Sequence, residues 1–276
     1  MSEYQYYKFQ ALDRPLTESD RAFLHSLSSR VEVTATTASF TYSYGDFRGD
    51  PQRVLERCFD IMLYLANWGT RQLLLRLPRS VVNLADFDAY YFPDIISTTG
   101  TSEDLVLDLN FEEEPVGWLE GSDWLERLAP LRDELLNGDL RLLYLAWLKA
   151  TQIAIDETEE DPLEPPVPPN LQKLSPALQA FVELVEIDPA LLRAAAQASA
   201  PLPEHSEPPE QQIAKLTATE VHDFLVKIAQ GEPHVDRQIR ARLKALAMGS
   251  CQPQTVAPRR SLSQLLAIAA EQPQLV

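Results

Sequence analysis

Residues 31–77 read VEVTATTASFTYSYGDFRGDPQRVLERCFDIMLYLANWGTRQLLLRL, and their pattern decides the expected order of elements. Two runs of alternating apolar residues within 31–44 predict a β-hairpin. The segment 50–69 opens on Asp-Pro, repeats apolar residues at helical spacing and reaches a glycine, which predicts one continuous helix. Residues 71–77 then predict a further strand.

The elements on either side of this stretch complete the expected fold. Residues 4–12 alternate as a strand, and Thr17, with an aspartate three positions later, predicts a helix start. The resulting order β-α-β-β-α-β is that of the ferredoxin-like split βαβ fold, which belongs to the α+β class. Residues 104–112 predict an extra strand with one apolar and one acidic face, and helices are expected at 122–136 and 140–148.

The chain of 276 residues is long enough for two domains. We expect a ferredoxin-like α+β domain with added helices at 1–152 and a helical region at 172–276. Residues 153–171 are rich in acids and prolines, which predicts a stiff, solvated linker between them. Ser175 and Asp188 each precede a proline, and these pairs predict the starts of two helices after the linker.

Charge is unevenly distributed along the chain. The formal net charge is −17, and the stretch between Arg79 and Arg127 holds twelve Asp or Glu and no Lys or Arg. This balance opposes binding to nucleic-acid backbones and anionic lipid, and it favours cations or a basic protein surface. By contrast, residues 237–260 contain six bases and no acid. The basic segment could face the protein's own acidic face, an acidic partner, or solvent.

The residues that we expect to bind partners come from these two stretches. They are Asp104, Asp108, Glu112, Glu113 and Glu114 in the acidic stretch, and Arg237, Arg240 and Lys244 in the basic segment. The carboxylates between residues 86 and 114 also suggest a divalent-metal site. Their spacing fits no known ligand loop, so we assign no metal ligand and no catalytic residue.

The sequence lacks the motifs of nucleotide cofactors and of common catalytic centres. Neither Gly-rich phosphate-binding pattern occurs, no G-x-S-x-G elbow is present, and the histidines and Cys251 lack zinc-ligand spacing. No cofactor is therefore predicted. Cys58 lies on the apolar side of the expected helix and is expected to be a buried thiol.

The N-terminus, MSEYQYYKFQ, has no apolar segment of the signal-peptide type. The longest charge-free apolar stretch, residues 61–70, is too short to cross a bilayer. We therefore expect a cytoplasmic protein without membrane contact.

Four longer stretches together resemble a family of uncharacterised bacterial proteins. They are YYKFQALDRPLT, GDFRGDPQ, YLANWGTRQLLLRLP and WLERLAPLRDELLNGDLRLLYLAWL. The resemblance extends across the N-terminal half and into the helical half. Members of that family are often encoded beside a SWIM-type zinc-finger protein, so the resemblance implies a protein partner rather than a substrate. It implies no catalytic residues.

These observations predict a non-enzymatic, acidic interaction or adaptor protein that docks a basic partner on its negative face. One alternative is a divalent-metal-dependent hydrolase or nuclease that uses the Asp/Glu cluster of residues 86–114. Another is a nucleic-acid-binding accessory protein that uses the basic segment.

Overall fold

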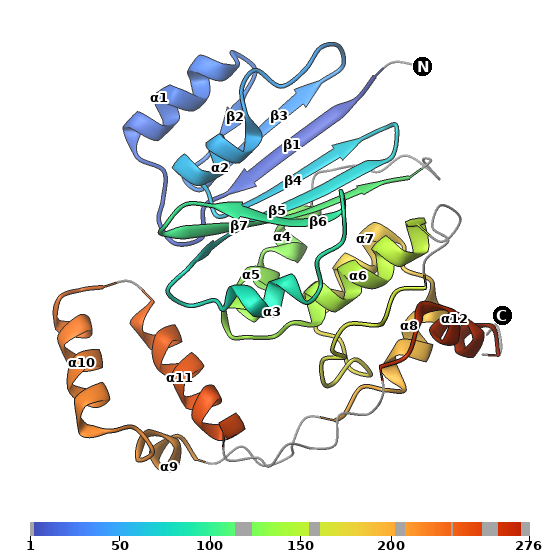
Figure 1. Ribbon diagram of the computed structural model, residues 1–276. Helices are drawn as coiled ribbons and strands as arrows, with labels where there is room; N and C mark the ends of the chain where they lie inside the picture. Colours follow the sequence, from blue (N-terminus) through green and yellow to red (C-terminus); the bar gives the residue numbers. More distant parts are fainter. Residues whose placement is uncertain are drawn as a thin grey trace.

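The chain folds as a mixed α+β protein built on a seven-stranded antiparallel sheet (Figure 1). The computed structural model describes residues 3–113, 123–154, 161–201, 208–232, 234–249 and 259–271. The strands are, in chain order, β1 (Gln5–Gln10), β2 (Glu32–Val33), β3 (Thr37–Tyr42), β4 (Ile61–Ala66), β5 (Thr70–Pro78), β6 (Ile96–Gly100) and β7 (Asp104–Glu112). Their order across the sheet is β2-β3-β1-β4-β5-β7-β6.

Helices cover both faces of this sheet (Figure 1). One face carries α1 (Glu18–Leu27) and α2 (Pro51–Cys58), and the other carries α4 (Trp124–Leu128), α5 (Pro130–Leu136), α6 (Arg141–Ala154) and α7 (Pro176–Val185). The remaining helices are α3 (Leu84–Asp88), α8 (Pro189–Ala196), α9 (Pro209–Ile213), α10 (Ala218–Ala229), α11 (Val235–Gly249) and α12 (Leu262–Ala270). Of these, α8 and α12 pack against each other, whereas α9, α10 and α11 extend away from the sheet. None of the described helices has the length and apolar character needed to cross a membrane.

Each face of the sheet has its own apolar core. Under α1 and α2 the core is aromatic and includes Phe9 and Phe40, whose ring centroids are 6.0 Å apart. On the opposite face the sheet packs against α4 to α8, and Phe111 of β7 contacts Phe181 of α7. A helix from the C-terminal half therefore belongs to the same core as the sheet.

The helix expected over residues 50–69 is wrong in its second half. The helix α2 ends at Cys58, and the apolar run that follows forms β4, between β1 and β5. The first three residues of β4 are 0% exposed, because both faces of this central strand are covered. In a run where nearly every residue is apolar, apolar residues recur at the spacing of a helix and also fill both faces of a strand. The periodicity of such a run therefore does not distinguish a helix from a buried strand. The expected strand at 71–77 follows as β5 and does not lie beside β1.

Other local predictions are confirmed. Thr17 and Asp20 form a reciprocal capping box at the start of α1. The hairpin within 31–44 corresponds to β2 and β3, and the strand at 104–112 coincides with β7. Cys58 is a buried free cysteine, and burial together with the nearby Asp20 carboxylate raises its pKa to about 11.

Two predictions about the helical half are also confirmed. The side chains of Ser175 and Asp188 accept hydrogen bonds at the starts of α7 and α8. Residues 141–148 of the helix expected at 140–148 lie in α6, whose first eleven residues are all buried. The single helix expected at 122–136 is instead two helices, α4 and α5, because Pro130 begins the second; residue 122 lies outside the described residues. Neither α3 nor β6 was predicted.

The described part of the expected linker, residues 161–171, is not solvated throughout. Glu164 is 2% exposed, and its carboxylate accepts hydrogen bonds from Arg260 Nε at 2.8 Å and Nη2 at 2.7 Å. The hydroxyl of Tyr144 in α6 donates to the same carboxylate. The expectation of a solvated connector is therefore corrected here, whereas the division into two domains stays a prediction.

The capping aspartate of α1 makes a pH-dependent contribution to stability. Burial alone would raise the pKa of Asp20, but hydrogen bonds from Arg14 and Thr17 outweigh it and hold the pKa below its usual range. A carboxyl group with a lowered folded-state pKa stabilises the protein above its unfolded pKa of about 4, and this stabilisation is lost as the pH falls. We expect Asp20→Asn to lower the free energy of unfolding by about 1–2 kcal/mol at pH 7.

Urea denaturation of both proteins between pH 7 and pH 3 would check this expectation. The difference between wild type and Asp20→Asn should shrink as the pH falls below about 4, because the wild-type carboxylate then loses its advantage. Glu18→Gln, at an exposed position of the same helix turn, is the matched control. A difference that stays constant over this pH range would contradict the assignment.

Candidate functional site

The acidic residues expected to bind a partner do not form one open face. Asp104 accepts a hydrogen bond from Arg76 Nη1 at 3.1 Å, and Asp108 accepts two from the Gln72 amide at 2.9 and 3.0 Å. Both donors belong to β5, which pairs with β7 along its whole length. Burial raises the pKa of Asp108. These two carboxylates therefore already have partners within the sheet.

Glu113, directly after β7, belongs to a second internal ionic cluster. Its carboxylate lies 2.6 Å from Lys149 Nζ and 3.7 Å from Arg71 Nη1, and the two basic side chains are 1% and 6% exposed. Burial lowers the pKa of Lys149, and the Glu113 carboxylate opposes that shift. Glu112 is exposed, and Glu114 lies outside the described residues.

Four exposed carboxylates of the acidic stretch lie in the segments before and after the strand β6, and we call this set the acidic surface. They are Asp86, Asp88, Asp94 and Glu103. The first two lie in α3, the third in the connection from α3 to β6, and the fourth in the turn between β6 and β7. Within the part of the chain that the structure describes, none of the four forms an ion pair with Lys or Arg. Tyr91 and Leu84, in the same segments, are 59% and 38% exposed.

The strand β6 is the last strand of the sheet and pairs with β7 alone among the described strands. Edge strands are frequent points of contact with other chains, because their outer backbone groups have no strand partner. The acidic surface therefore borders an edge strand rather than a closed part of the sheet.

The described residues offer no site for the metal-dependent alternative. In residues 3–113 and the other described ranges, no group of three or more His, Cys, Asp or Glu side chains is placed to hold a metal ion. The strand carboxylates are instead engaged by Arg76, Gln72 and Lys149. His205 and Cys251 lie outside the described residues.

Where the structure describes its side chains, the basic segment forms ion pairs with acids other than the four of the acidic surface. Arg237 Nη2 lies 2.6 Å from the Asp133 carboxylate of α5, and Arg242 Nε donates to Glu220 of α10 at 2.7 Å. Arg240 is exposed, and the side chain of Lys244 lies outside the described residues. Together with Arg260, which pairs with Glu164, three of the described arginines are thus neutralised locally, which leaves less free positive charge for a nucleic-acid backbone than the sequence suggests.

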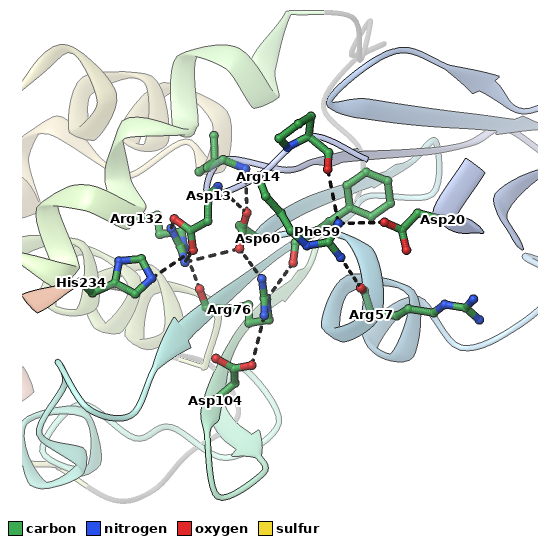
Figure 2. A network of polar contacts seen from close by, with 12 residues as sticks. Asp13, Arg14, Asp20, Arg57, Phe59, Asp60, Arg76, Asp104, Arg132 and His234 are labelled. Atoms are coloured by element: carbon green, nitrogen blue, oxygen red, sulfur yellow. Dashed lines mark hydrogen bonds and ion pairs between the residues drawn. The ribbon is translucent and has the colours of Figure 1, made fainter. Parts of the chain in front are cut away.

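A buried polar network under β4 and β5 was not predicted from the sequence (Figure 2). At its centre is Asp60, which is 1% exposed. Its Oδ2 accepts hydrogen bonds from the backbone amides of Leu12 and Asp13 at 2.6 and 2.9 Å. Its Oδ1 accepts from Arg76 at 2.6 Å and lies 3.4 Å from Arg132. The one signal in the sequence was an acid inside the apolar run CFDIML.

The same network reaches the helices of the C-terminal half. Arg132 of α5 is 1% exposed and binds the Asp13 carboxylate through two hydrogen bonds, at 2.9 and 2.6 Å. His234, just before α11, approaches the same carboxylate, with 3.4 Å between Nε2 and Oδ2 (Figure 2). Burial would raise the pKa of Asp13, but the bonds from Arg132 keep it lowered. The network therefore connects the sheet, α5 and the start of α11.

The carboxylates of the described residues fall into two groups, one buried and one exposed. Buried carboxylates are paired with arginines and backbone amides, which gives them structural roles, while unpaired carboxylates are exposed beside an edge strand. No protein-family model, curated protein or solved structure matches the chain. The resemblance to bacterial proteins and the implied SWIM-type partner therefore stay predictions.

Proposed function

We propose that the protein is a non-enzymatic adaptor that docks a basic protein partner on the acidic surface. The observation that carries the proposal is the exposure of Asp86, Asp88, Asp94 and Glu103 without a basic partner among the described residues. Three other acids of the stretch, Asp104, Asp108 and Glu113, are paired within the protein and are therefore not available to a basic partner.

The chemistry around these carboxylates fits protein recognition. The exposed ring of Tyr91 and side chain of Leu84 supply apolar area beside the charges, and tyrosine is enriched among the residues that dominate interface energies. The net charge of −17 adds a long-range field that speeds the approach of a basic partner. The carboxylates would thus select the partner and the apolar side chains would hold it.

A charge-reversal experiment tests this proposal. We expect the variant with Asp86, Asp88, Asp94 and Glu103 all changed to Lys to lose its basic partners in quantitative affinity purification from cells of the source organism. With a purified partner, the association rate at low salt should fall by at least about tenfold. The acidic surface is exposed, so the thermal unfolding of the variant should stay close to that of wild type.

The control variant reverses four other exposed acids, Glu18, Asp46, Asp223 and Glu232. It changes the net charge by the same amount, so it separates a local surface from the overall field. Recovery of the same partners by wild type and by the first variant would refute the proposal. Equal losses in both variants would assign the effect to net charge alone.

We also propose that β1 to β4 form the split βαβ unit of a ferredoxin-like fold, extended by β5, β7 and β6. In support, β1 lies between β3 and β4 and is antiparallel to both. The connections also agree, because α1 joins β1 to β2 and α2 joins β3 to β4.

A further inference from the structure

The backbone of the edge strand β6 has hydrogen-bonding groups that point out of the sheet. Ile96 exchanges two backbone hydrogen bonds with Phe92, which precedes the strand. The Ile96 amide donates to the Phe92 carbonyl at 2.9 Å, and the Phe92 amide donates to the Ile96 carbonyl at 3.3 Å. The backbone groups of Ile96 therefore face away from β7. Alternate residues of a strand direct these groups to the same side, so Thr98 and Gly100 face outward as well.

The hydrogen bonds on the other side of β6 agree with this assignment. The Thr101 amide donates to the Asp104 carbonyl at 2.9 Å, and the Asn110 amide donates to the Ile95 carbonyl at 2.9 Å. Residues 95 and 101, on either side of β6, thus face β7. The odd-numbered residues of β6 therefore face β7, and the even-numbered residues face outward.

The outward groups of Thr98 and Gly100 are open to another chain. In the part of the chain that the structure describes, their amides and carbonyls have no hydrogen-bond partner. The bridge to Phe92 closes the edge at Ile96, whereas Gly100 is exposed. We call residues 98–100 the open edge.

The sequence of β6 does not protect this edge. Sheet edges are commonly protected by charged side chains, by proline or by a very short strand. The strand β6 reads ISTTG, without charge or proline, and three of its five residues are β-branched. The opposite edge strand, β2, has only two residues, and one of them is Glu32. Of the two edges, β6 is thus the one suited to pair with another strand.

The charges near β6 indicate what such a strand would carry. Asp94 lies two residues before β6, and Glu103 lies in the turn that follows it. Exposed carboxylates therefore stand at both ends of the strand. The net charge of −17 adds a long-range attraction for a basic segment.

Arginines also lie near β6, but they do not cancel this negative charge. Arg79 follows β5, and its amide donates to the Glu103 carbonyl at 2.8 Å. Arg259 lies within electrostatic range of the segment after α3. Arg53 belongs to the turn of α2 that contacts β6, and it pairs with Asp50. Arg79 and Arg259 thus stand against the four carboxylates of the acidic surface.

We propose that a basic, extended segment of the partner protein pairs with the open edge as an additional strand. Its backbone would exchange hydrogen bonds with Thr98 and Gly100, and its Lys or Arg side chains would reach Asp94 and Glu103. Addition of a strand to an exposed sheet edge is a general mode of peptide recognition. This binding mode rests on the basic-partner docking proposed above and specifies how that partner binds. A second copy of this chain is disfavoured, because it would bring the same unpaired carboxylates to the edge.

Binding of two labelled peptides to the full-length protein tests the proposal. Both have the sequence Lys-Val-Lys-Val-Lys-Val-Lys, and the second is methylated on its five interior amide nitrogens. Methylation removes the backbone donors that strand pairing requires and leaves the charge unchanged. Fluorescence anisotropy should show at least tenfold weaker binding of the methylated peptide, which corresponds to about 1.4 kcal/mol. Hydrogen exchange of the Thr98 and Gly100 amides should slow when the unmethylated peptide is bound.

Thr98→Pro removes one outward amide from the open edge, and it breaks no bond to β7 because that amide faces away from the sheet. This variant should bind the unmethylated peptide at least tenfold more weakly. Thr98→Ala keeps the amide and is the matched control, which should bind as wild type does. Melting temperatures would show whether Thr98→Pro is folded. The comparison of the two peptides uses the wild-type protein and does not depend on that variant.

Several results would overturn the proposal. Equal affinities for the two peptides, or no binding of either at about 1 mM, would remove the added strand. Unchanged exchange of the Thr98 and Gly100 amides at saturation would do the same. A dimer of the protein that Thr98→Pro dissociates would assign the open edge to a second copy.

Failure of the acidic docking site is a separate outcome. The variant with all four carboxylates of the acidic surface changed to Lys should bind the unmethylated peptide at least tenfold more weakly than wild type. If it does so while both peptides bind wild type equally, the docking site stands and strand pairing is overturned. If it binds as wild type does while methylation still weakens binding, strand pairing stands and the acidic docking site is overturned.

Discussion

Replacing Asp60 with alanine is expected to lower the free energy of unfolding by about 3–5 kcal/mol. The carboxylate is 1% exposed and accepts hydrogen bonds from two backbone amides and from Arg76. Its removal leaves those amides without their acceptor and leaves Arg132, which is equally buried, with less compensation for its charge. Breaking a buried ion pair from one side costs more than the pair itself contributes, because the remaining charge stays desolvated.

Urea denaturation followed by circular dichroism would measure this loss. Asp86→Ala is the control, because it also removes a carboxylate but from the exposed acidic surface; its effect should stay within about 0.5 kcal/mol. Similar small effects for both variants would mean that Asp60 does not hold the sheet and α5 together. Asp60→Asn keeps an acceptor oxygen for the amides, so it should be less destabilising than Asp60→Ala.

Phe181→Ala is the second substitution with a large expected effect, about 3–5 kcal/mol. The Phe181 ring is 0% exposed and lies edge-on to Phe111 of β7, with 6.0 Å between the ring centroids. Since both rings belong to one core, the loss should lower a single unfolding transition that includes the sheet. Differential scanning calorimetry would distinguish this from the selective melting of a separate helical region.

Leu225→Ala serves as the control for Phe181→Ala, because Leu225 is 60% exposed and its truncation creates no internal cavity. Two resolved transitions, with only one shifted by Phe181→Ala, would support a division into independent domains near residue 171. A single shifted transition would show that α7 unfolds together with the sheet.

Local signals in the sequence were sufficient for many elements. Thr17 and Ser175 begin helices because their side chains accept hydrogen bonds from backbone amides three residues later. The strand at 104–112 was predicted because its leucines alternate with polar residues, and β7 has the same bounds. In each case the physical cause lies within a few residues of the element itself.

The failures have causes outside the local sequence. The expectation of a helix over β4 is wrong because the burial of this strand on both faces depends on β1, β5 and the helices around them. The partners of Asp104 and Asp108 depend on the register of β5, which places Arg76 and Gln72 within reach. The number of acids in the sequence is therefore larger than the number of unpaired carboxylates on the surface, because a count of residues does not show which of them have partners.

The salt bridge between Glu164 and Arg260 determines where the chain rejoins the body in the C-terminal half. Arg260 also donates to the Ala194 carbonyl of α8 at 3.0 Å, so the chain returns to α8 after it has formed α9, α10 and α11. Those three helices are thus an insertion whose two ends are anchored at one place on the body. A force applied to any of the three helices would therefore be borne by both ends of the insertion at the same place on the body.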